Sequence, residues 1–211
     1  LILKWYAQGK ISPDLEIASV LPHAPRGITV AHCLSHSSGY PAWRPFYAAH
    51  IEDLLEWDTG ICRKDILHRA VSSKAESQPM VQHKYSDIGF LALCAVIEEM
   101  SGLPLDEVWR NTLPTAATRG LTWGHPTAAA TEQCPVRQHM VTGEVHDLNA
   151  AAMGNVSSHA GLFGDVRSVA EAACWPLAGW HGRHPDLPAA AVHHFWTTRG
   201  AGTHCLGWDT P

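Results

Sequence analysis

Residues 84–105 read KYSDIGFLALCAVIEEMSGLPL, and this stretch decides how the rest of the chain is interpreted. Its apolar side chains recur at the three- and four-residue spacing of one helical face, which predicts an amphipathic helix that starts after Tyr85. Ser101-Gly102 followed by Pro104 is typical of a helix end, because glycine accepts the left-handed conformation and proline cannot continue the helix. The predicted apolar face consists of Phe90, Leu93, Cys94, Ile97 and Met100.

Outward from this helix, the pattern favours more helices separated by long loops. Thr29 can cap a short helix that contains Val30, Cys33 and Leu34 and ends in the turn Ser37-Ser38-Gly39. Alternating apolar and polar runs are nearly absent, so few strands are expected and the chain is predicted to be rich in α-helix. Other predicted helices are Leu1 to Gly9, Leu105 to Leu113 and Gly161 to Leu177, and a long loop is predicted from Pro114 to Met140.

The composition excludes several classes of protein. The 211 residues are 45% hydrophobic and 17% charged, a mixture that can bury a core. The formal net charge is -5 and no basic run occurs, so no nucleic acid partner is expected. No apolar run is long enough to cross a bilayer, so no transmembrane segment is expected. The opening residues Leu1 to Lys4 lack the features of a signal peptide and suggest a fragment, so localisation stays open between periplasm and cytoplasm.

The cysteines and histidines do not form a recognisable metal-binding pattern. The six cysteines never occur as a Cys-x-x-Cys pair, and we favour buried thiols over disulfides, although both stay open. His32 and His36 are spaced like two ligands on one helical face, but no glutamate follows His32 as in His-Glu-x-x-His. We therefore predict no metal site.

Three segments resemble the class C β-lactamase and penicillin-binding-protein family of serine hydrolases. They are residues 28–41 (ITVAHCLSHSSGYP), residues 84–105, and residues 131–164, whose second half is similar to the family pattern GxVHDxNAxxLGGVAGHAGLF. The resemblance implies an α+β parent fold of which this chain is mainly the α-helical region with long loops. It also implies that residues 1–211 are the interior part of a single β-lactamase-like domain, truncated at both ends.

The same resemblance implies candidate site residues. Tyr85 matches the family tyrosine that acts as general base, a role that needs nearby positive charge because a free phenol has a pKa near 10. Asp87 stands where many members have asparagine, so it either contacts the substrate or is a helix N-terminal carboxylate. His159 and Gly161 are expected to shape the edge of the substrate pocket. His146, Asp147 and Asn149 are expected to form a hydrogen-bonded scaffold.

Two motifs of the family are missing from the chain. No serine is followed three residues later by lysine, and no closing Lys/His-Thr-Gly motif occurs. The implied function is hydrolysis of an ester, amide or β-lactam bond through an acyl-serine intermediate whose nucleophile lies outside this chain. A small-molecule or peptide substrate and no cofactor are implied. These residues alone are then expected to be inactive and to form no acyl adduct.

Two other readings remain open. The first is a non-catalytic binding or structural remnant of the same fold, in which the helical region serves as a scaffold. The second is a Ser-His-Asp site of an unrelated fold, which the absence of a Gly-x-Ser-x-Gly segment disfavours.

Overall fold

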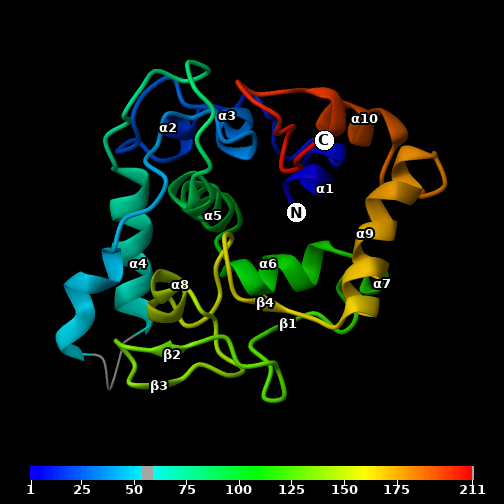
Figure 1. Ribbon diagram of the computed structural model, residues 1–211. Coiled ribbons are helices and arrows are strands. Elements are labelled where there is room, and N and C mark those ends of the chain that lie inside the picture. Colours follow the sequence, from blue (N-terminus) through cyan, green and yellow to red (C-terminus); the bar gives the residue numbers. More distant parts are fainter. Residues whose placement is uncertain (54–58, 211) are drawn as a thin grey trace.

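The computed structural model describes residues 1–53 and 59–210 of the chain. These residues form helices connected by loops, with two small antiparallel ladders at one end (Figure 1). The helices are α1 (Ile2–Ala7), α2 (Ile17–Val20), α3 (Val30–Leu34), the 3-10 helix η1 (Phe46–Asp53), α4 (Thr59–Val71), α5 (Asp87–Ser101), α6 (Leu105–Thr112), α7 (Thr115–Thr118), α8 (Leu148–Ala152), α9 (Val166–Trp180) and α10 (Ala189–Thr197).

Helix α5 lies at the centre of the fold, between α4 and α3 and in contact with α2 and α6 (Figure 1). Ser86 caps it, since the Ser86 Oγ accepts a hydrogen bond from the Gly89 N–H (3.0 Å) and donates one to the Pro41 carbonyl (2.6 Å). Gly102 ends it in the left-handed conformation (φ 68°). The predicted helix is therefore confirmed, and Met100 on its apolar face is 40% exposed.

Strands are short in the described part of the chain. Strand β1 (Thr122–Trp123) pairs with β4 (Leu162–Phe163), so that Thr122 lies opposite Phe163. Strand β2 (Gln133–Cys134) pairs with β3 (His139–Met140), so that Cys134 lies opposite His139. The scarcity of strands agrees with the sequence pattern, whereas the predicted loop from 114 to 140 also contains α7 and three of these strands.

The predicted helix from Gly161 to Leu177 begins later than expected. Gly161 has φ 105° and the next two residues pair with β1, so the chain is extended there. Helix α9 starts only after Asp165, whose side chain accepts a hydrogen bond from the Ser168 N–H (2.7 Å) and caps it. The pairing of β4 with β1, which lies about forty residues earlier in the chain, is a tertiary contact that local periodicity does not encode.

The short helix α3 forms with the predicted cap. The Thr29 Oγ1 accepts a hydrogen bond from the His32 N–H (3.3 Å), and the His32 ring accepts one from the Thr29 N–H (3.1 Å). The helix ends at Leu34, and His36 lies beyond it with φ 52°. His32 and His36 therefore do not share a helical face. The described residues contain no group of three or more side chains arranged to hold a metal ion.

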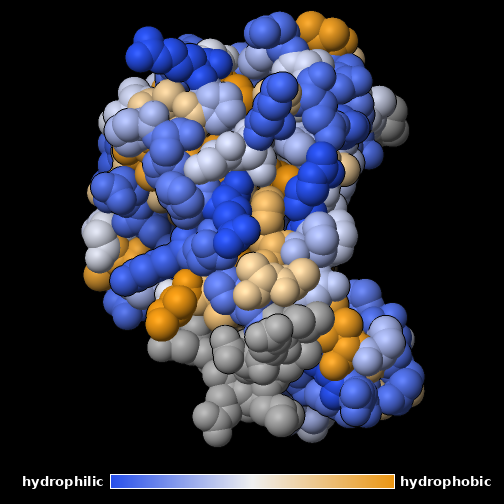
Figure 2. All heavy atoms as spheres, turned by 90° about the vertical axis from the view of Figure 1, so that its left-hand side faces the viewer, coloured by the Kyte–Doolittle hydropathy of each residue, from blue (hydrophilic) through white to orange (hydrophobic). Residues whose placement is uncertain are grey.

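None of the six cysteines forms a disulfide, and all but Cys174 are buried. Burial raises the pKa of Cys33 and of Cys94 to about 12, so both stay protonated. The prediction of buried thiols thus holds for five of the six. The face of the molecule in Figure 2 is largely hydrophilic, with hydrophobic residues in scattered patches. In the described ranges no single helix is long and apolar enough to span a membrane, and α5 and α6 meet at a bend of 71°.

Candidate functional site

Tyr85 lies just before α5 on a cluster of histidines. Its side chain is 62% exposed, and its ring stacks on His36 with centroids 4.2 Å apart. His36 is buried and its Nδ1 accepts a hydrogen bond from the Ser86 N–H (3.0 Å). Burial, together with the charges of His204 and His83, lowers the pKa of His36 to about 4. His36 is therefore a neutral platform for the phenol at neutral pH.

The basic groups near Tyr85 in the described residues have other partners. Lys84, its neighbour in sequence, forms an ion pair with Glu76 (2.5 Å). His83 Nε2 lies 2.9 Å from His204 Nδ1, so one ring donates its proton to the other. His204 also lies 3.4 Å from the Asp209 carboxylate. The positive charge that a tyrosine base needs is therefore not supplied by a lysine of the described chain.

Asp87 is the first residue of α5 and lies on the same side of the chain as Tyr85. Ser86 between them is extended (φ −135°, ψ 111°), and side chains alternate in extended backbone. Burial raises the pKa of the Asp87 carboxyl, Asp147 adds to the rise, and His159 opposes it. The Asp87 carboxylate accepts no hydrogen bond from the described residues, although its N–H donates to Ala42 (2.8 Å). It is thus free to meet a ligand.

His159 lies in the middle of a row of three hydrogen-bonded side chains. Its Nε2 is 2.9 Å from Asp147 Oδ1, and its Nδ1 is 2.7 Å from Ser157 Oγ. The His159 side chain is only 3% exposed. Both ring nitrogens are occupied, so His159 has no free nitrogen for a substrate. Sequence reasoning placed His159 at the pocket but missed Ser157, whose signal is a hydroxyl two residues before that histidine.

Asp147 connects this row to the surrounding structure. Burial by itself would raise the pKa of Asp147, but hydrogen bonds from His159, from the Ala150 N–H (2.7 Å) and from Trp43 hold it below its usual range. Asn149 anchors the adjacent loop, accepting a hydrogen bond from the Tyr47 N–H (3.0 Å) and donating one to a main-chain carbonyl. Both residues therefore act as scaffold, whereas His146 pairs with Glu132 (3.1 Å) and is exposed.

Gly161 is required by the backbone rather than by a ligand contact. A Cβ added at Gly161 would lie 2.2 Å from the Asn155 carbonyl oxygen, and its φ of 105° is strained for any other residue. Gly39 is also required by the backbone, since a Cβ there would lie 2.2 Å from the Ser77 carbonyl oxygen. The two glycines allow the loops at 39 and 161 to pack against neighbouring backbone.

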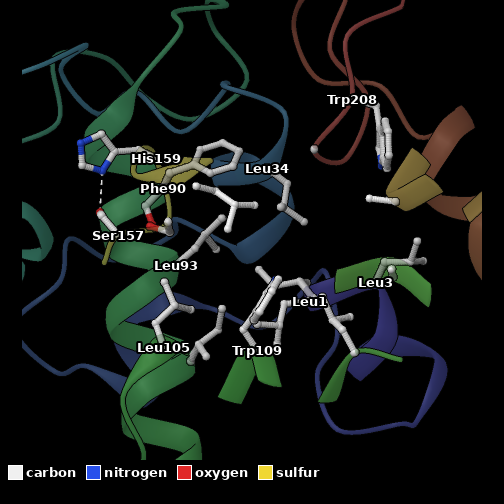
Figure 3. Close-up of a pocket in the computed structure, with 18 of the residues that line it drawn as sticks. Leu1, Leu3, Leu34, Phe90, Leu93, Leu105, Trp109, Ser157, His159 and Trp208 are labelled. Carbon is white, nitrogen blue, oxygen red and sulfur yellow. Dashed lines mark hydrogen bonds between the residues drawn. The ribbon is translucent and has the colours of Figure 1, made fainter. Parts of the chain in front are cut away.

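A cavity of about 580 Å³ opens beside the row of Asp147, His159 and Ser157. Figure 3 shows Ser157 and His159 at one edge of it, next to Phe90 and Leu93, and the rest of the lining is aliphatic and aromatic. Helices α5, α6, α9 and α10 and the first residues of the chain contribute to this wall. The labelled apolar residues in Figure 3 are Leu1, Leu3, Leu34, Phe90, Leu93, Leu105, Trp109 and Trp208.

Phe90 connects the tyrosine cluster with the cavity. Its ring stacks on His36 at 5.1 Å, its side chain lines the cavity, and its carbonyl accepts a hydrogen bond from Ser158 Oγ (2.6 Å). The predicted site residues thus fall into two neighbouring groups. Tyr85 lies on the histidine cluster, whereas His159 and Gly161 line the cavity and Asp87 lies near His159.

Comparisons with known proteins agree on one family. A family model described as Beta-lactamase matches residues 1–207. A protein of Escherichia coli K12 named "Putative D-alanyl-D-alanine carboxypeptidase" is 28% identical over 97% of this chain, and the chain spans 54% of that protein's length. The chain therefore covers about half of this relative.

Solved structures share the fold at low identity. A D-stereospecific amidohydrolase from Streptomyces aligns with a TM-score of 0.66 and 21% identity, over 98% of this chain and 65% of its own. An octameric penicillin-binding protein homologue from Pyrococcus abyssi aligns with a TM-score of 0.65 and 19% identity, over 93% of this chain and 45% of its own. Both alignments support the expected α+β fold type, represented here mainly by its helical region.

Proposed function

We propose, from the premise that this chain belongs to the beta-lactamase family, that it supplies the helical half of a serine hydrolase. The enzyme would open an ester, amide or β-lactam bond through an acyl-serine intermediate. The nucleophile would lie on a segment outside residues 1–211, because no serine here precedes a lysine at the required spacing. Residues 1–211 would then be the interior part of one β-lactamase-like domain.

One observation carries this proposal, namely the position of Tyr85. The phenol is exposed at the foot of a capped central helix and rests on the neutral ring of His36. We assign it the role of general base toward the nucleophile or general acid toward the leaving group. The lysine that lowers its pKa would come with the nucleophile, since Lys84 is already paired with Glu76.

The other site residues would set the shape and charge of the substrate pocket. The unpartnered carboxylate of Asp87 would contact the substrate next to the scissile bond. His159 and Gly161 would shape the pocket from the loop behind it, His159 through its hydrogen bonds and Gly161 through its backbone. The named relatives make amides of D-amino acids the first substrates to test. No cofactor is needed for this chemistry.

The test uses a longer protein that carries residues 1–211 together with an upstream Ser-x-x-Lys segment. We expect it to be labelled by a fluorescent penicillin or to hydrolyse nitrocefin, a p-nitrophenyl ester or a D-alanyl-D-alanine peptide. The Tyr85→Phe variant should lose about 10²- to 10⁴-fold in kcat/KM while keeping its melting temperature. A matched control is Tyr6→Phe, because Tyr6 packs on His194 and Phe195, away from the histidine cluster.

Two outcomes would contradict the proposal. If the longer protein shows no labelling and no hydrolysis of any of these substrates, a non-catalytic binding remnant of the fold becomes the better description. If the protein is active but Tyr85→Phe retains full kcat/KM, the general base lies elsewhere.

A further inference from the structure

The hydrogen-bonded row of Ser157, His159 and Asp147 supplies no reacting group to the reaction proposed above, in which His159 only shapes the pocket. A hydroxyl, an imidazole and a carboxylate in this order are the groups with which a base activates a serine nucleophile. We propose that Ser157 is a second nucleophile, activated by His159 and Asp147, that accepts acyl or phosphonyl groups from electrophiles bound in the apolar cavity. This site needs no nucleophile from another segment and uses only residues of this chain.

The hydrogen bonds of the row fix the tautomer of His159. A carboxylate can only accept, so the Nε2 of a neutral His159 carries the proton and donates it to Asp147 Oδ1 (2.9 Å). The Nδ1 is then a lone-pair acceptor, and it faces Ser157 Oγ at 2.7 Å. The Ser157 hydroxyl therefore donates its proton toward a base. The carboxylate stays ionised near neutral pH, since its hydrogen bonds lower the pKa of Asp147 despite burial.

The row is oriented by neighbouring elements, so its geometry is held in advance of any ligand. Asp147 also caps α8 by accepting a hydrogen bond from the Ala150 N–H (2.7 Å), which holds its carboxylate toward His159. Arg63 donates to the carbonyl of Val156, the residue before Ser157 (2.5 Å). A side chain whose base and orienting group are both anchored in this way loses little entropy when it reacts.

Ser157 is buried, yet it belongs to the wall of the 580 Å³ cavity. The volume is in the range of small-molecule sites, and the lining is mostly aliphatic and aromatic, with Phe90, Leu93 and Trp208 among it (Figure 3). The side chains with a hydroxyl or an imidazole in the cavity wall are Ser157, Ser158 and His159. The cavity therefore fits an ester or phosphonate with an apolar body.

Ser157 also departs from the family pattern that the surrounding segment otherwise follows. The pattern reads VAGHAGLF, whereas residues 156–163 read VSSHAGLF. Ser157 thus replaces an alanine and Ser158 a glycine. The Ser158 hydroxyl donates to the Phe90 carbonyl (2.6 Å), which gives it a scaffold role. The Ser157 hydroxyl has His159 as its partner among the described residues.

The proposed step is balanced within the site. Ser157 Oγ forms a bond to the carbonyl carbon or phosphorus while its proton moves to His159 Nδ1, and the proton on Nε2 stays hydrogen-bonded to Asp147. The bond to the leaving alkoxide or fluoride then breaks, and Nδ1 returns the proton to the leaving group. The Ser158 N–H is directed to the Cys94 thiol, whereas the Ala160 N–H donates to no acceptor in the described chain, so Ala160 is the candidate donor to the developing oxyanion.

The test treats residues 1–211 with an alkyl fluorophosphonate carrying a fluorophore and follows adduct formation by gel fluorescence and intact mass. We expect one adduct per chain, mapped to Ser157 by peptide mass spectrometry. Ser157→Ala should abolish it, whereas Ser158→Ala, the neighbouring hydroxyl, should retain it. Protein unfolded in urea should not react, because an isolated serine hydroxyl is a weak nucleophile.

The role of the base is tested with His159→Gln and Asp147→Asn, each checked for native circular dichroism. Both should slow labelling by about 10²-fold or more. For a variant that fails to fold, the second measurement is the comparison of Ser157→Ala with Ser158→Ala, of which only the first should lose the adduct. No adduct on folded wild type, an adduct that persists in Ser157→Ala, or an unchanged labelling rate in folded His159→Gln would each overturn the proposal.

These outcomes are separate from the test of the proposed function. The labelling uses no segment beyond residues 1–211, whereas the family reaction needs a Ser-x-x-Lys serine that this chain lacks. The sequence predicts that residues 1–211 form no acyl adduct, and an adduct on Ser157 would correct that prediction without bearing on Tyr85.

Discussion

Replacing Arg63 by methionine tests how the central helix is tied to the loop that carries the candidate site. Arg63 Nε lies 3.1 and 3.2 Å from the two carboxylate oxygens of Glu98, and its Nη2 also binds this carboxylate. Its Nη1 donates to the carbonyls of Val156 (2.5 Å) and Met153 (3.3 Å). Arg63 thus connects α4 with α5 and with the segment just before residue 157.

The expected loss of stability follows from the burial of the ion pair between Arg63 and Glu98. The Arg63 and Glu98 side chains are 15% and 19% exposed, so methionine at 63 would leave a carboxylate largely buried without its cation. Removing one partner of a buried ion pair costs roughly 3 to 5 kcal/mol, and the remaining exposure favours the lower end, about 3 kcal/mol. In a domain of this size roughly 2 to 4 °C of melting temperature are lost per kcal/mol, which gives a decrease of about 6 to 12 °C.

The assay is a thermal melt followed by circular dichroism, with Arg110→Met as matched control. Arg110 pairs with Asp106 one helical turn away (2.7 Å), but its side chain is 57% exposed. An exposed pair of this type contributes about 0.5 kcal/mol, so the control should melt within about 2 °C of the wild type. If Arg63→Met melts as close to the wild type as the control, the ion pair does not stabilise the fold and the reasoning is refuted.

Three further predictions concern backbone strain, thiol reactivity and acid stability. In urea melts, Gly161→Ala should destabilise the protein by more than Gly182→Ala, which we expect to cost about 1 kcal/mol. Both glycines have positive φ, but only a Cβ at 161 would meet backbone, 2.2 Å from the Asn155 carbonyl oxygen. Equal losses of stability would contradict this close approach. Ellman's reagent should titrate one thiol rapidly, Cys174, and the other five only on unfolding, and fast release of more than one would contradict their burial. The pKa of the Asp147 carboxyl is held low in the folded state by His159 despite burial, so its contribution to stability is present above the unfolded pKa near 3.9 and is lost as pH falls through the folded value. Asp147→Asn should therefore reduce the free energy of unfolding at neutral pH and flatten its decrease on acidification, and an unchanged acid profile would show that this carboxylate is not the group concerned.

The parts of the fold that the sequence predicted are those set by local interactions. Helix α5 follows from its apolar spacing and from the Ser86 cap, and α3 follows from Thr29, since both caps bond backbone atoms within three residues. The start of α9 was predicted wrongly because residues 162 and 163 pair with β1, a partner distant in sequence. Met100 on the apolar face of α5 is 40% exposed, because local spacing does not determine which part of a helical face other elements cover.

The candidate site also has a part that short sequence motifs predict and a part that only tertiary packing determines. Its family residues lie in short motifs, so Tyr85, Asp87, His159 and Gly161 could be proposed from the resemblance of those motifs to the family, while their roles remain proposals. What the motifs do not encode is the partner of each side chain, such as His36 beneath the Tyr85 ring. Partners of this kind come from segments about fifty residues apart, and only tertiary packing determines which groups meet.

The sequence by itself determined the family, the predominance of helix and the lack of a Ser-x-x-Lys nucleophile, because these depend on residue identity and short-range spacing. Only the tertiary structure decided that Asp147, His159 and Ser157 form one hydrogen-bonded row beside an apolar cavity. The physical reason is that a hydrogen bond depends on the distance and direction between two side chains. The loop between Asp147 and His159 sets both, through the α8 cap and the positive φ of Gly154, and no local pattern specifies that path.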